Sequence, residues 1–88
     1  MTDRQPITVK IELFAIYQET LGQKDVSYQF PPNTPVQAVL DRLILDRPQL
    51  AQWRDVTRFG INLEFVAPET IVQDGDEIVL IPPVSGGW

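Results

Sequence analysis

The chain of 88 residues contains neither cysteine nor histidine. Without cysteine it has no thiol nucleophile and forms no disulfide, so its fold does not depend on an oxidising compartment. Without histidine it lacks the commonest general base and the commonest metal ligand. An independent enzyme is therefore the weakest functional hypothesis, because the sequence offers neither a nucleophile–base pair nor a metal-binding cluster.

Long hydrophobic runs and positive charge are also scarce. No stretch approaches the roughly 20 apolar residues of a membrane-spanning helix, and residues 1–6 do not lead into the apolar core of a signal peptide. We therefore expect a cytoplasmic protein that makes no membrane contact. Seven Lys and Arg against twelve Asp and Glu give a net charge of −5. That charge argues against nucleic acid as a partner, since the phosphate backbone requires a basic surface.

The apolar residues that are present, 43% of the chain, suffice for the core of one small domain, which we place at residues 1–81. Apolar and polar residues alternate over residues 7–13 and again over 26–30, and this period of two predicts two strands, each with one wet face. Between them, residues 14–21 predict one or two helical turns that end at Gly22.

The next segment carries the signals of a longer helix. Thr34 is the expected N-cap, Pro35 occupies the first helical position, and Gln37 is placed to close a capping box. Pro48 marks the end. The apolar stripe expected to face the core recurs at helical spacing and consists of Val36, Val39, Leu40, Leu43 and Ile44.

The second half of the domain predicts further strands. Residues 56–66 predict two short strands that meet near Asn62. Asp74-Gly75-Asp76 predicts a tight turn, and with Glu77 these acids fit a solvated turn better than a metal site. The run 78–81 is apolar without alternation, which is typical of a strand buried on both faces in the middle of a sheet.

One helix is long enough to cover a sheet, so all strands should share one sheet with that helix on one face. If the last strand is central, its natural neighbour is the first strand. We therefore predict an α+β domain of the ubiquitin-like β-grasp type, with a mixed sheet of four to five strands.

The sequence after the last strand predicts an extended, flexible tail over residues 82–88. Pro82-Pro83 cannot continue a ladder, because proline lacks the N–H donor, and the pair favours a polyproline conformation. Residues Val84-Ser85-Gly86-Gly87 carry no large side chain. Such a tail, on the order of 20 Å from Pro82 to Gly87, fits a narrow tunnel in a partner, and a glycine carboxylate is little hindered toward activation.

The segment Asp74-Gly75-Asp76-Glu77-Ile78-Val79-Leu80-Ile81-Pro82-Pro83-Val84-Ser85-Gly86-Gly87 resembles the C-terminus of the molybdopterin synthase small subunit. Phe14-Ala15, Leu21-Gly22 and Ile61-Asn62 also match the pattern of that family, so the resemblance extends over residues 7–87. It implies a β-grasp sulfur carrier that is the non-catalytic small subunit of the synthase.

The resemblance also implies a role for each part of the tail. An adenylating enzyme of the ubiquitin-activating type uses ATP to activate Gly87, which then becomes a thiocarboxylate. Residues Pro82, Pro83, Val84, Ser85, Gly86 and Gly87 enter a tunnel in the large subunit, and the sulfur passes to the pterin precursor. The carrier itself binds no cofactor and no metal.

Trp88 departs from the family pattern, in which Gly87 is last. We expect a protease to remove it. Two alternatives remain open at this point: a divergent paralogue that no longer carries sulfur, or a residue added to the natural chain.

A docking patch for partners is expected near the root of the tail, formed by Phe14, Phe65, Leu80 and Ile81. Two other functions compete with the molybdopterin pathway. One is a sulfur carrier for thiamine, cysteine or another thio-compound. The other is a ubiquitin-like binding module whose tail takes part in no chemistry.

Overall fold

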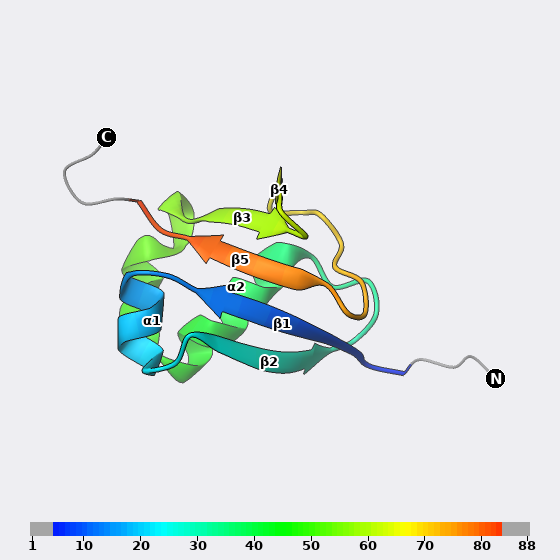
Figure 1. Cartoon of the computed structure of the whole chain (residues 1–88), viewed down its shortest axis with the longest axis horizontal. Coiled ribbons are helices and arrows are strands. Elements are labelled where there is room, and N and C mark those ends of the chain that lie inside the picture. Colours follow the sequence, from blue (N-terminus) through cyan, green and yellow to red (C-terminus); the bar gives the residue numbers. More distant parts are fainter. Residues whose placement is uncertain (1–4, 84–88) are drawn as a thin grey trace.

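The computed structural model describes residues 5–83 (Figure 1). Its elements follow the predicted order, and the bounds of the strands and helices are β1 (Ile7–Leu13), α1 (Ile16–Leu21), β2 (Asp25–Phe30), α2 (Val36–Asp46), the 3₁₀ segment η1 (Pro48–Val56), β3 (Arg58–Ile61), β4 (Glu64–Val66) and β5 (Glu77–Ile81). The predicted end of α1 is confirmed. Gly22 caps the helix in a left-handed conformation (φ 71°), and its N–H donates to the carbonyl of Gln18 at 2.8 Å.

The strands form one five-stranded sheet in the order β2-β1-β5-β3-β4. The central pair, β1 and β5, is parallel, and the other three pairs are antiparallel. In Figure 1 helix α2 lies across one face of this sheet, and α1 lies at the end where β5 finishes. The arrangement confirms the predicted α+β, β-grasp architecture, with β5 in the middle of a mixed sheet.

The core lies between α2 and the face of the sheet that it covers. Alternate residues of the two central strands point into it, because successive side chains of a strand face opposite sides. The predicted stripe of α2 supplies the other wall, and its member Ile44 is partly buried at the edge. The buried residues of these three elements are Val9, Ile11, Leu13, Val36, Val39, Leu40, Leu43, Ile78 and Leu80.

The expectation that β5 is buried on both faces is wrong. Ile78 and Leu80 are fully buried against α2, whereas Val79 and Ile81 are half-buried on the other face. The two faces of β5 differ in burial because α2, which packs across the sheet, covers only one of them (Figure 1). We call the uncovered face of the sheet, on which Val79 and Ile81 lie, the open face. Packing in the core does not account for the apolar residues on this face.

The predicted N-cap of α2 is also wrong. The helix begins at Val36 with Pro35 in the cap position, and no side chain caps it. Thr34 donates its hydroxyl instead to the carbonyl of Pro31, at 2.6 Å. The amide of Gln37 reaches forward along the helix toward Asp41, at 3.4 Å, so no capping box forms.

Backbone from a distant segment caps the helix in place of a side chain. The N–H of Val36 donates to the carbonyl of Thr70 at 2.7 Å, and that of Gln37 donates to the carbonyl of Pro68 at 2.9 Å. The segment is held in place by the N–H of Val72, which donates to the carbonyl of Thr34 at 2.9 Å. Two N–H groups that a helix start leaves unpaired are thereby satisfied.

A buried hydroxyl pair ties α1 to the segment that precedes β3. Tyr17 is fully buried, and its hydroxyl donates to Oγ1 of Thr57, which donates in turn to the carbonyl of Trp53 at 2.8 Å. Burial raises the pKa of Tyr17, and the hydrogen bond with Thr57 opposes this in part. The neutral phenol is therefore the form that the folded protein holds.

We expect Tyr17→Phe to lower the free energy of unfolding by about 1 kcal/mol, the usual contribution of one buried hydrogen bond. Because the folded pKa lies above the unfolded one, the phenol's contribution is present below about pH 10 and is lost as the pH rises further. Urea unfolding at neutral pH and at pH 10 to 11 measures both effects, and the variant should lose less stability over that interval than the wild type.

Tyr28→Phe is the matched control, because the hydroxyl of Tyr28 donates to Asp46 at the surface. Its removal should change stability at neutral pH by only a few tenths of a kcal/mol. Equal unfolding midpoints for Tyr17→Phe and the wild type would contradict the assignment of Tyr17 as a buried donor.

Candidate functional site

The site is the end of the sheet where the predicted tail leaves the domain. Ile81, the last residue of β5, pairs with Arg58 of β3. Pro82 is buried and Pro83 is half-buried, and both line a groove with Trp53 and the start of α1. A proline ring packs here without an unpaired N–H, because proline has none. The prediction that the free tail begins at Pro82 is therefore wrong for this residue, which belongs to the packed body.

The remaining tail residues of the prediction lie outside the described part of the chain: Val84, Ser85, Gly86, Gly87 and Trp88. The assignment of Gly87 as the reactive residue therefore stays a prediction. What the structure provides is the direction and the anchoring of the segment that leads to it.

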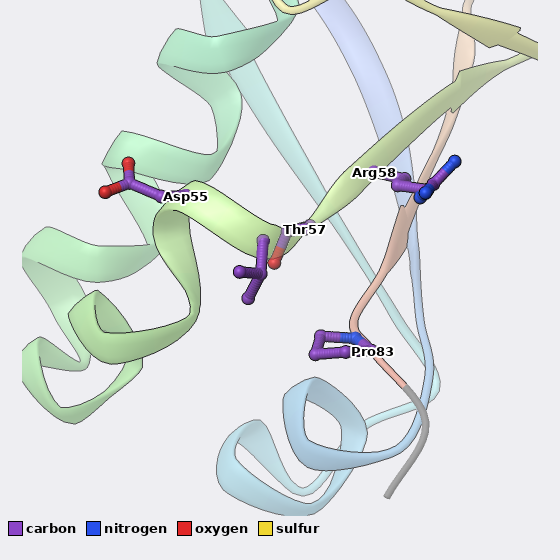
Figure 2. A pocket seen from close by; sticks show the side chains of 5 residues that line it. Asp55, Thr57, Arg58 and Pro83 are labelled. Atoms are coloured by element: carbon purple, nitrogen blue, oxygen red, sulfur yellow. The ribbon is translucent and has the colours of Figure 1, made fainter. Parts of the chain in front are cut away.

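A second hollow lies on the other side of Pro83, and Figure 2 shows it from close by. It encloses about 370 Å³ and is lined by Asp55, Val56, Thr57, Arg58 and Pro83. Asp55 points away from Pro83 in this view, and its carboxylate pairs with Arg54 at 3.4 Å. The hydroxyl of Thr57 is already used by Tyr17 and Trp53. The hollow thus holds charged and polar groups but no activated nucleophile.

Three of the four predicted patch residues come together on the open face. Phe14, Phe65 and Ile81 line one shallow depression of about 260 Å³, together with Val79. Phe14 is 46% exposed and Phe65 is 74% exposed. Large aromatic side chains at this exposure are typical of surfaces that bind another protein.

The assignment of Leu80 to this patch is wrong. Leu80 is fully buried and is opposite Leu13 on one side and Phe59 on the other. Strand alternation sends its side chain to the α2 side and its neighbours Val79 and Ile81 to the open face. Leu80 is a core residue.

Gly60 gives the depression its floor. It is paired with Val79 on one side and with Phe65 on the other. A Cβ at Gly60 would lie 3.7 Å from the Cβ of Val79, so the missing side chain belongs to the open face. Its absence leaves the space between β5 and the ring of Phe65 unfilled.

Leu63 is a member of the patch that the sequence did not identify. It lies at the tip of the β3–β4 hairpin, is 96% exposed and lines the same depression. Both loop residues have positive φ, 50° at Asn62 and 73° at Leu63, as a type I′ turn requires. Glycine is the preferred residue at the second position, so a leucine there is strained. The signal that could have found it was an apolar residue directly after the turn asparagine.

The acidic turn before β5 is structural. One oxygen of Asp74 accepts from the N–H of Thr8 at 2.8 Å. Asp76 accepts from the N–H of Gln73 at 2.7 Å and from the amide of Asn62 at 3.0 Å. Within residues 5–83 no group of acids is arranged to hold a metal ion, and no helix there is long and apolar enough to cross a membrane.

Comparison with known proteins places this geometry in a family. The model of the ThiS family matches residues 11–87, which include the double glycine. The chain belongs to the ThiS family. It is 35% identical over 85 residues to the molybdopterin synthase sulfur carrier subunit of Arabidopsis thaliana, covering 97% of this chain and 88% of that protein. The resemblance to the molybdopterin synthase small subunit is thereby confirmed.

Solved structures agree with the fold. The small archaeal modifier protein 1 of Haloferax volcanii superposes with a TM-score of 0.78 at 30% identity, covering 91% of this chain and 99% of that one. A chain in the complex of subunits 1 and 2 of the molybdopterin-converting factor from Helicobacter pylori gives a TM-score of 0.59 at 22% identity, covering 92% of this chain and all of that one. The latter likeness concerns the fold alone.

We expect Leu63→Gly to raise the free energy of unfolding by about 1 kcal/mol, because a non-glycine residue in the left-handed region costs about 1–2 kcal/mol. Chemical denaturation measures the change. Leu45→Gly is the matched control, since Leu45 is also exposed but lies within α2, where glycine should lower stability by about 1 kcal/mol. Destabilisation by both variants would contradict the assignment of strain to Leu63.

Proposed function

We propose that the chain is the sulfur carrier subunit of molybdopterin synthase and carries sulfur as a thiocarboxylate on Gly87. The observation that carries the proposal is family membership that extends through Gly86-Gly87, together with the similarity to sulfur carrier subunits over nearly the whole chain. The fold supports it, because the central strand β5 leads directly into the segment that would carry the sulfur.

The chemistry needs a free carboxylate on Gly87 and no catalytic side chain of this chain. An adenylating enzyme of the ubiquitin-activating type joins that carboxylate to the α-phosphate of ATP and releases pyrophosphate. Hydrosulfide then attacks the acyl carbon and AMP leaves, so that a C–S bond replaces the C–O bond to AMP and the thiocarboxylate remains. In the large subunit this sulfur passes to the pterin precursor, and water restores the carboxylate.

Trp88 must be removed first, because the carboxyl group of Gly87 is otherwise held in a peptide bond. We therefore include a trimming protease among the partners. The carrier binds no cofactor in this scheme, and ATP is used by the activating enzyme. A cytoplasmic location is part of the proposal, since ATP is available there.

The large subunit is the main proposed partner. The Helicobacter pylori structure is a complex of two subunits, and one of its chains has this fold. In the present chain the open face is the surface that fits such a role. It joins the exposed rings of Phe14 and Phe65 to the root of the tail through Ile81, so a partner seated there would meet the tail as it leaves the domain.

The first test is the chemistry of the tail. The 88-residue chain and a variant that ends at Gly87 are each incubated with ATP, a sulfur source and the adenylating enzyme, and their intact masses are followed. The variant that ends at Gly87 should exchange one oxygen for sulfur. The 88-residue chain should do so only after a protease has removed Trp88.

A variant that ends at Gly86 controls for non-specific sulfuration and should remain unmodified. Sulfur on a chain that still carries Trp88 would contradict the need for trimming. No sulfur on the chain that ends at Gly87 would overturn the carrier assignment. If the chain lacking residues 86–88 then kept its cellular function, the binding-module alternative would hold.

The second test concerns docking. We expect Phe65→Ser to weaken binding to the large subunit by at least about tenfold, or ~1.4 kcal/mol, because exposed aromatic side chains dominate interface energetics. Isothermal titration calorimetry with the purified large subunit measures the affinity.

Leu45→Ser is the matched control for the loss of an exposed apolar side chain, since Leu45 lies on α2 and not on the open face. Its affinity should equal that of the wild type. An equal loss of affinity in both variants would mean that the open face is not the docking surface. Copurification of the chain with a subunit of another sulfur pathway would favour the thiamine or other thio-compound alternative.

A further inference from the structure

An apolar groove lies beside the root of the tail, next to the depression on the open face, with which it shares Phe14 and Ile81. We call it the tail-root groove. It runs between the start of α1 and the end of β5, encloses about 420 Å³, and draws its apolar lining from Phe14, Ile16, Trp53 and the two prolines. Of the described residues that line it, one is charged, Glu19. Its size is within the range of small-ligand pockets, about 300–1,000 Å³.

A strained residue shapes one wall of this groove. Ala15 has φ 53° and ψ −123°, a conformation that residues other than glycine rarely adopt. The kink lies between Phe14 and Ile16, and all three residues line the groove. Such strain persists only where the surrounding structure enforces it, and it is concentrated at binding sites.

The sequence beyond Pro83 contains one side chain that matches this groove. Pro83 itself lines the groove, and Trp88 lies five residues further along the chain. Gly86-Gly87 can adopt the positive φ values that a tight reversal requires. We propose that the indole of Trp88 docks in the tail-root groove of its own chain.

The chemistry of the groove fits an indole. The rings of Phe14 and Trp53 offer aromatic contacts, and the carboxylate of Glu19 can accept the indole N–H. The hollow on the other side of Pro83 is lined by Asp55, Val56, Thr57 and Arg58 besides Pro83, so it offers no aromatic ring among its described residues. The tail-root groove is therefore the preferred seat.

Docking would keep the double glycine against the body. The Gly87–Trp88 peptide bond would then be exposed only while the indole is undocked, and the untrimmed tail would not extend into a partner. This consequence for the carrier rests on the proposed function. The docking of Trp88 does not rest on it, so the two ideas can fail separately.

The test uses the fact that the chain has only two tryptophans. Trp53→Phe leaves Trp88 as the sole tryptophan and keeps an aromatic ring in the groove. Quenching of its fluorescence by acrylamide is compared with that of the free peptide Val-Ser-Gly-Gly-Trp. A docked indole should be quenched several-fold less and should emit at a shorter wavelength.

Variants in the two hollows show where the indole sits. In the Trp53→Phe background, Phe14→Glu should raise quenching to the level of the peptide. Val56→Glu, in the hollow beyond Pro83, should leave it unchanged. Circular dichroism checks that each variant is folded, and Ile16→Ser replaces Phe14→Glu if that variant is not.

A second measurement keeps Trp53 in place. Carboxypeptidase A should release Trp88 several-fold more slowly from the folded 88-residue chain than from the peptide, and Phe14→Glu should remove the difference. Quenching and release that both match the peptide would overturn the docking proposal, whatever the tail chemistry. Exposure of Trp88 by Val56→Glu but not by Phe14→Glu would also overturn it. A protected Trp88 on a chain that takes up no sulfur after trimming would support docking and overturn the carrier assignment.

Discussion

The parallel pairing of β1 with β5 is the constraint on which the rest of the structure depends. Parallel neighbours need a crossover connection, because the chain must return to the same end of the sheet. Helix α2 lies on that return path and covers one face of the sheet. With β5 fixed beside β1, the sequence after β5 leaves the domain next to α1, where Phe14, Trp53 and the two prolines meet. One strand pair thus sets the core, the open face and the exit point of the tail.

The open face shows a conflict between stability and binding. Phe65 and Leu63 are largely exposed and add little to the core. Leu63 also adopts a left-handed backbone conformation that glycine adopts more readily. Ala15, which lines the neighbouring tail-root groove, also has a positive φ, 53°. Natural proteins commonly retain strain and exposed apolar area where function needs them. Phe65 and Leu63 line the depression on the open face that also contains Ile81, and Ala15 lies in the groove at the root of the tail.

Much of the fold could be predicted from the sequence, because its signals are local. The alternation over residues 7–13 and the apolar stripe of α2 needed no tertiary information. The cap of α2 could not be predicted, since its acceptors are backbone carbonyls of Pro68 and Thr70, which carry no side-chain signature. Which face of the sheet each side chain of β5 occupies could not be predicted either, for a different reason. An apolar run without alternation does not show which side is uncovered, so Leu80 was predicted to lie at the surface. Pro82 was predicted to lie in the tail because proline cannot continue a ladder, and that signal does not show that its ring packs against the domain.

The backbone cap of α2 affects how the sequence can vary and how the fold assembles. Carbonyl groups are present whatever side chains a segment carries, so the connection around Pro68 and Thr70 can change composition and still hold the helix start. The same contact ties the start of α2 to the connection that precedes β5. Such coupling between distant parts of the chain favours unfolding as a single cooperative unit.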